Sequence, residues 1–90
     1  MTTIRLKQYG HFLSGRSLPQ KILSEVMIDN VIKLDFSGVS ACNQSFVNEL
    51  FQCIEARGIK LSTVEIIGLD TSNLQNIVGV ERARFIQITA

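Results

Sequence analysis

The sequence predicts one α/β domain over residues 1–90, with a small mixed, mostly parallel sheet and helices packed on it. Three observations lead to this fold class. The apolar, β-branched run Val31–Phe36 is typical of a strand. The segment Asn43–Arg57 that follows carries apolar residues at helical spacing. Strand and helix patterns then keep alternating with short connections, which favours right-handed crossovers between parallel strands.

The first third of the chain predicts two strands and a helix. Polar and apolar residues alternate over Thr3–Lys7, as in a short strand with one buried face. His11–Leu13 predicts a brief second strand, which we expect to form a hairpin with the first. Ser17 suits a helix N-cap, and Pro19 is tolerated in the first turn. The helix then runs to the turn at 29–30, with apolar residues at helical spacing: Leu18, Ile22, Leu23, Val26 and Met27.

The middle third gives the clearest pattern. Val31–Phe36 predicts a central strand covered on both faces, and Ser37–Cys42 predicts a loop. The helix Asn43–Arg57 is closed by Gly58, which can adopt the left-handed conformation. One helix face is apolar: Phe46, Val47, Leu50, Phe51, Cys53 and Ile54. The opposite face predicts a polar ridge in water: Ser45, Asn48, Glu49, Gln52 and Glu55.

The last third is less regular. Ser62–Ile67 predicts another strand, and Asp70, Thr71 or Ser72 is expected to cap a third helix. That helix should be short, because Gly79 costs about 1 kcal/mol relative to alanine inside a helix. Phe85–Ile88 fits either a final edge strand or a helical tail.

Composition narrows the functional classes. The net charge is +1 and no basic run is present, so we expect no nucleic-acid binding. The chain shows no signal peptide and no apolar stretch near the ~20 residues of a membrane span, which predicts a cytoplasmic protein without a membrane contact. Cys42 and Cys53 lack the spacing of metal or redox motifs, and no Gly-rich phosphate loop is present. We therefore expect no metal and no cofactor.

No constellation of catalytic residues is apparent, so we assign none and expect a non-enzyme. His11 is the single histidine and has no local partner for nucleophilic catalysis. Cys42 precedes a helix N-terminus, which leaves a reactive thiol as one interpretation and a packed cysteine as the favoured one. Asp35 ends the central strand, where α/β sheets bind ligands. We favour a structural role for Asp35 instead, accepting hydrogen bonds from amides of residues 37–39.

A resemblance to a known family sharpens this interpretation. Val31–Phe51 contains Leu-Asp-Phe at a strand end, a Ser-Gly-Val turn, and Ser-Phe opening a helix with Glu-Leu. This segment resembles the STAS-like family, bacterial and phage domains related to anti-sigma factor antagonists. Gly15-Arg16 also resembles the family's entry to the first helix. The resemblance implies a compact sheet with helices on one side, and a function in protein binding.

The resemblance also implies a site. In anti-sigma factor antagonists, the matching helix opens with Asp-Ser-Ser-Gly, and a partner kinase phosphorylates the second serine. Ser45 matches that serine, whereas Asn43, Gln44 and Phe46 replace the other three residues. A phosphate on Ser45 would be stabilised by the helix N-terminus, and it would add negative charge to a docking surface. A solvated or capping serine is the alternative.

We expect the partner to bind the turn and the start of this helix. The expected binding residues are Ser37, Gly38, Asn43, Gln44, Ser45, Asn48, Glu49 and Gln52. The resemblance implies a partner that is a serine kinase or an anti-sigma-type regulator with a histidine-kinase-like ATPase fold. The alternative function is a non-phosphorylated scaffold or oligomerisation module of a bacterial or phage operon. A small enzyme that uses Cys42 ranks third, and the pattern does not determine the oligomeric state.

Overall fold

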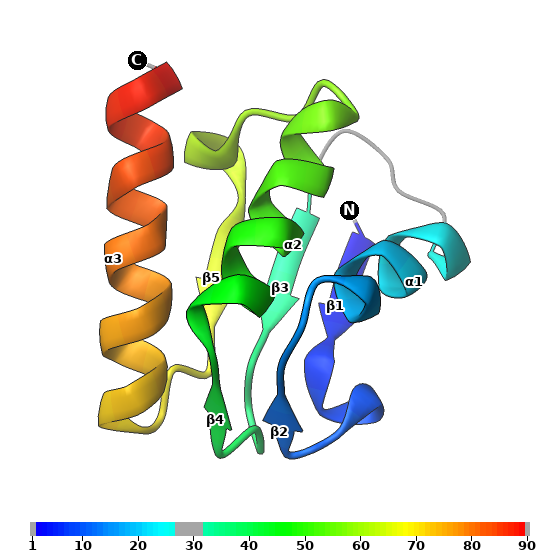
Figure 1. Ribbon diagram of the computed structural model, residues 1–90, viewed down its shortest axis with the longest axis vertical. Helices are drawn as coiled ribbons and strands as arrows, with labels where there is room; N and C mark the ends of the chain where they lie inside the picture. The colour runs from blue at the N-terminus through cyan, green and yellow to red at the C-terminus, as the bar shows by residue number, and fades with distance from the viewer. Residues whose placement is uncertain (1, 27–31, 90) are drawn as a thin grey trace.

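Three parallel strands form the main sheet, in the order β1–β3–β5 (Figure 1). The structure, a computed structural model, describes residues 2–26 and 32–89. Strand β1 spans Thr2–Arg5, β3 spans Ile32–Asp35 and β5 spans Glu65–Ile67. Leu34 of the middle strand pairs with Ile4 on one side and with Ile66 on the other. The predicted central position of this strand is therefore confirmed.

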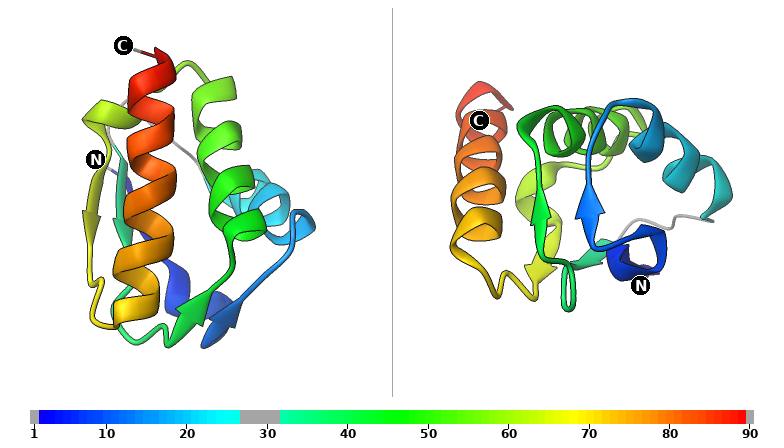
Figure 2. Two further views of the ribbon diagram at one scale, coloured as in Figure 1. Left: turned by 60° about the vertical axis from the view of Figure 1, so that its left-hand side comes forward. Right: turned by 60° about the horizontal axis from the view of Figure 1, so that its bottom comes forward.

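The main sheet is covered by helices on one face (Figure 2). Ile32 and Leu34 are fully buried, whereas Lys33 and Asp35 alternate with them and stay partly exposed. Lys33 forms an ion pair with Glu65 of the neighbouring strand, at 3.3 Å between Nζ and Oε2. The prediction that both faces of β3 are covered is wrong, because the two charged side chains share the face that carries no helix layer.

The helix layer contains α1 (Ser17–Glu25), α2 (Gln44–Ala56) and α3 (Ser72–Thr89), with α2 in the middle in contact with the other two. The predicted apolar face of α2 is buried except for Cys53, which is partly exposed. Phe51 of α2 meets Phe85 of α3 edge to face, with ring centroids 5.6 Å apart. This edge-to-face arrangement is a favourable geometry for an aromatic pair and helps to hold α3 on the layer.

A second, two-stranded parallel sheet pairs β2 (Phe12–Leu13) with β4 (Ala41–Cys42). The predicted hairpin between the first two strands is wrong. A 3₁₀ turn, η1 (Leu6–Tyr9), and Gly10 redirect the chain after β1, so β2 pairs with a segment about thirty residues later. The prediction of a loop over Ser37–Cys42 is wrong at its end, since Ala41 and Cys42 form β4.

The helix ends agree with the sequence in part. Asn43 caps α2, and its Oδ1 accepts a hydrogen bond of 2.9 Å from the Phe46 amide. Gly58 follows that helix with a φ of 81°, as predicted. Pro19 lies in the first turn of α1, but Ser17 is the first helical residue and not its cap. The predicted end of that helix at 29–30 lies outside the described residues.

The last third differs most from the expectation. Leu61–Thr63 forms a 3₁₀ turn, η2, and only Glu65–Ile67 is a strand. Helix α3 is long, since Gly79 does not end it and the segment after Glu81 continues it. Thr71 provides the cap, as its Oγ1 accepts a 3.2 Å hydrogen bond from the Leu74 amide. The aromatic contact of Phe85 with α2 explains why the tail is a helix and not an edge strand.

Candidate functional site

The turn after β3 is held by its own polar groups. Asp35 Oδ1 accepts a 2.9 Å hydrogen bond from the Ser37 amide, as the sequence predicted. Hydrogen bonds from the Ser37 side chain and amide lower the pKa of Asp35. Gly38 has a φ of 85°, and a Cβ there would lie 2.5 Å from Cδ of Lys7. The turn leaves Ser37 and Gly38 exposed at its tip.

The N-terminus of α2 emerges directly from β4. Asn43 donates its amide to the Leu13 carbonyl at 3.1 Å, which joins the helix start to β2. Gln44 and Ser45 form the first turn with Phe46, and this turn contains no acidic residue. Ser45 is partly exposed, whereas Phe46 beside it is fully buried. The predicted phosphorylation candidate thus lies in the first turn of the helix, as expected.

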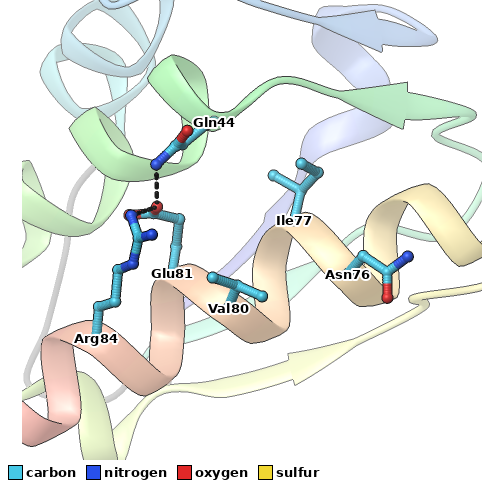
Figure 3. Close-up of a pocket in the computed structure, with 6 residues that line it drawn as sticks. All are labelled: Gln44, Asn76, Ile77, Val80, Glu81 and Arg84. Atoms are coloured by element: carbon cyan, nitrogen blue, oxygen red, sulfur yellow. Dashed lines mark hydrogen bonds and ion pairs between the residues drawn. The ribbon is translucent and has the colours of Figure 1, made fainter.

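A buried carboxylate joins α2 to α3 (Figure 3). Glu81 is only 1% exposed. Gln44 Nε2 donates to its Oε1 at 2.8 Å, and Asn48 Nδ2 donates to its Oε2 at 3.2 Å. Arg84 forms an ion pair with Oε1 at 3.1 Å. The carboxylate therefore has two amide donors and one cation, which offset the cost of burying its charge.

A second set of contacts joins α1 to α2. Arg16 Nη1 donates to Asn48 Oδ1 at 2.9 Å and to Glu49 Oε1 at 3.2 Å. Gln20 Nε2 donates to Glu49 Oε2 at 3.2 Å. The hydrogen bond from Gln20, assisted by Arg16, lowers the pKa of Glu49. We call the whole set the helix network: Arg16, Gln20, Gln44, Asn48, Glu49, Gln52, Cys53, Glu81 and Arg84.

The helix network corrects the predicted polar ridge. Asn48 and Glu49 are only partly exposed, because both bond to side chains of neighbouring helices. Gln52 is exposed, and it donates to Asn48 Oδ1 at 2.7 Å. The predicted binding residues thus fall into two groups. Ser37 and Gly38 at the turn and Asn43 at the cap of α2 are exposed, and Ser45 is partly exposed beside them. Asn48, Glu49 and Gln52 belong to the helix network, and Gln44 joins the two groups.

The exposed group lies beside an apolar hollow. A pocket of about 240 Å³ is lined by Phe12, Leu13, Ser14, Ala41, Cys42 and Asn43. We call this region, together with the turn at Ser37 and Gly38, the β2–β4 end. A second pocket, of about 180 Å³, lies between α2 and α3 over the buried Glu81 (Figure 3). It is lined by Gln44, Asn76, Ile77, Val80, Glu81 and Arg84.

The two residues that the sequence offered as candidates for catalysis, Cys42 and His11, both contact the body of the domain. Cys42 is 6% exposed, and burial raises the pKa of its thiol to about 11. The thiolate is therefore scarce at neutral pH, which favours the packed cysteine over the reactive thiol. His11 Nδ1 lies 3.2 Å from the Gly38 carbonyl oxygen, where it links β2 to the turn.

Sequence reasoning did not find Glu81 or Phe12. Glu81 follows Ile77 and Val78 at helical spacing, which places it on the inner face of α3, and this pattern could have identified it. Phe12 is 76% exposed, although large apolar side chains are usually buried, so its residue type gave no signal of this position. Within the residues that the structure describes, no group of acidic, histidine or cysteine side chains is arranged to hold a metal. No described helix has the length and apolarity to cross a membrane.

Comparison with known proteins gives one match. A family model described as a STAS-like domain of unknown function (DUF4325) matches residues 14–74, more than half of the chain. The match includes α1, the turn after β3, all of α2 and the start of α3. No curated protein and no solved structure matches the chain.

Proposed function

The chain belongs to this STAS-like family, and we propose that it is a small regulatory protein–protein interaction domain and not an enzyme. Its role would be similar to that of the anti-sigma factor antagonists. The partner would bind the β2–β4 end and the first turn of α2, which are continuous through Asn43.

The first turn of α2 is the observation that carries the proposal. Ser45 is partly exposed there, at a helix N-terminus without an acidic residue. Free amides and the helix dipole at such a position stabilise a negative group. A phosphate on Ser45 would add about −1.5 to −2 of charge to the surface without opposing the helix. The added charge would then act on partner binding and not on folding.

Two observations support binding in place of catalysis. The thiol of Cys42 is buried with a raised pKa, and the imidazole of His11 contacts a backbone carbonyl. The two side chains that could take part in catalysis are thus engaged in contacts within the domain. By contrast, Ser37 and Gly38 at the turn and Asn43 at the start of α2 are exposed, which leaves this surface accessible to a partner.

The proposed partner follows from the family resemblance. It is a serine kinase or an anti-sigma-type regulator with a histidine-kinase-like ATPase fold. Such a partner would contact Gln44 and Ser45 first. Asn48 and Glu49 would be reached only at their exposed atoms, because the helix network already uses their polar groups.

One observation favours the alternative of a non-phosphorylated scaffold. Phe46 occupies the position of the glycine in the antagonist motif, and it is fully buried in the core. Asn43 occupies the acidic position, where its side chain caps the helix. Both replacements fix the start of the helix by packing and capping, which a constant binding surface requires as much as a switched one.

Co-expression with the adjacent genes tests the proposal. A tagged wild-type chain and Ser45→Ala would be purified, and the bound proteins and the intact mass of the chain would be measured. We expect a co-purifying protein, and one phosphoryl group on the wild type that Ser45→Ala lacks. A stable complex without modification would favour the scaffold. If no protein co-purifies with either chain, the interaction function is contradicted.

A further inference from the structure

Phe12 is exposed without a structural reason inside the domain. Its side chain is 76% exposed, whereas the adjacent Leu13 is 1% exposed. Strand alternation places successive side chains on opposite sides, so β2 directs Leu13 into the core and Phe12 outward. A large aromatic ring there is the kind of side chain that protein interfaces enrich.

The hollow beside Phe12 is suited to an apolar side chain. Leu13 and Cys42 are buried in the pocket wall, and Ala41 is partly exposed. The hollow has a volume of about 240 Å³ and is open to solvent, and the exposed Phe12 is one of the residues that line it. An apolar group that enters would gain contacts with the wall and with the Phe12 ring at once.

The backbone of β2 favours an extended occupant. The carbonyls of His11 and Leu13 accept hydrogen bonds from the Ala41 and Asn43 amides of the β4 side. In a parallel ladder, the N–H and C=O of Phe12 therefore point to the opposite edge. No other strand of the described chain pairs with that edge. An extended segment could bond there while its side chain enters the hollow.

The charge around the hollow selects an acidic occupant. The chain has no acidic residue before Glu25, although its first 24 residues include Lys7 and Arg16. Residues 36–48, which form the turn, β4 and the first turns of α2, contain no charged residue. The Lys7 side chain lies over Gly38, whereas the half-exposed guanidinium of Arg16 is already paired with Glu49. Lys7 and the N-terminus of α2 therefore favour negative charge at this end of the molecule.

We propose that Phe12 and the adjacent hollow anchor an extended segment of a partner protein, which inserts an apolar side chain between acidic neighbours. This inference rests on the proposed function and names the chemistry of the partner. A second copy of the chain fits less well, because a symmetric contact through this end would bring the Lys7 side chains of both copies to the same interface.

Panning of random linear peptides displayed on phage tests the inference. The baits are the wild-type chain, Phe12→Ser and Val80→Ser, which removes a different exposed apolar side chain, 52% exposed on α3. Circular dichroism would confirm that each bait is folded.

We expect the wild type and Val80→Ser to enrich peptides with an apolar residue flanked by Asp or Glu. Phe12→Ser should bind an enriched peptide about 30-fold more weakly, the fold-change that corresponds to a ~2 kcal/mol hot spot. Lys7→Ala should weaken binding less, and more at low salt than at high salt.

The other outcomes overturn the inference in distinguishable ways. Enriched peptides that bind Phe12→Ser as well as wild type would place the interaction elsewhere and leave the proposed function intact. The absence of any enriched peptide would exclude an extended segment. The co-expression experiment would then show whether the interaction function fails too. Phe12-dependent dimerisation in sedimentation, or Phe12-dependent binding to phosphatidylserine vesicles, would replace the partner segment with a second copy or a membrane.

Discussion

In the helix network, charged and amide groups of three helices satisfy one another, whereas at the β2–β4 end an aromatic ring lies in solvent. Glu81 is an acidic residue that is 1% exposed, and Phe12 is an apolar residue that is 76% exposed. An acidic side chain is usually exposed and a large apolar side chain is usually buried, so both residues depart from the rule. The burial of Glu81 is compensated by hydrogen-bond donors of the same chain. Among the described residues, no such compensation is seen for the exposure of Phe12.

This difference distinguishes residues that stabilise the fold from residues that we propose bind a partner. A buried carboxylate with three partners is explained by the fold, because α3 could not pack there without them. An exposed ring next to an apolar hollow is not explained by contacts among the described residues, and the proposed partner would supply the missing contact. Polarity alone is thus a poor guide to the binding surface of this domain, since much of the polar side of α2 holds the helices together.

The largest effect is expected from the core side of the first turn of α2. Phe46→Ala should lower the free energy of unfolding by about 3–5 kcal/mol, the usual cost of truncating a buried aromatic. Phe46 is fully buried and follows the partly exposed Ser45 directly. Urea denaturation would measure the change, with Phe12→Ala as the matched control. If the two substitutions lowered the free energy of unfolding equally, the assignment of Phe46 to the core and of Phe12 to the surface would be contradicted.

A smaller loss is expected from the helix network. Glu81→Ala leaves Gln44, Asn48 and Arg84 without their acceptor, which should cost about 1–3 kcal/mol. Glu65→Ala is the control, because Glu65 also has a cationic partner but lies at the surface. That control should cost less than about 1 kcal/mol. Thermal and urea denaturation would measure both variants. If Glu81→Ala and Glu65→Ala lost similar amounts of stability, the helix network would not be structural.

The helix N-terminus predicts a gain. Ser45→Asp should raise the free energy of unfolding by about 0.3–1 kcal/mol, because a negative charge there interacts favourably with the helix dipole. Ala56→Asp places the same charge at the last residue of α2 and should lower it by a similar amount. If Ser45→Asp unfolds the domain, Ser45 is a structural hydroxyl, and the proposed phosphorylation would not leave the fold intact.

The pH dependence is expected to be the smallest effect. The pKa values of Asp35 and Glu49 are lowered from 3.8 and 4.5 by their hydrogen bonds. Their contribution to stability is therefore complete above these ordinary values and is lost as the pH falls through the lowered ones. Denaturation over this acidic range should show a flatter profile for Asp35→Asn combined with Glu49→Gln. An unchanged profile would mean that these bonds do not stabilise the folded state.

Sequence reasoning found the fold class where local signals agree. The apolar face of α2, its Asn43 start and its Gly58 end all follow from the pattern of one segment. The central place of β3 was predicted from the apolar, β-branched run, which suggested a strand covered on both faces. The position is right, although Lys33 and Asp35 lie on a face without helices. These features depend on neighbouring residues, which the sequence contains.

The predictions are wrong where contacts between residues far apart in the sequence determine the structure. β2 pairs with β4 and not with β1, and no local pattern of two-residue strands specifies that choice. Helix α3 continues past Gly79 because Phe85 packs on Phe51 of another helix. The predicted ridge included Asn48 and Glu49, since only the folded layer brings Arg16 and Glu81 to them.

The most direct test measures stability and binding together for Phe12→Ser and Glu81→Ala, with the partner recovered by co-expression. We predict that Phe12→Ser unfolds within about 0.5 kcal/mol of the wild type, as surface substitutions usually do, and loses the partner in calorimetry. Glu81→Ala should lose stability while its folded fraction keeps the affinity of the wild type. The account is contradicted if Phe12→Ser binds the partner normally and Glu81→Ala abolishes binding without a change in stability.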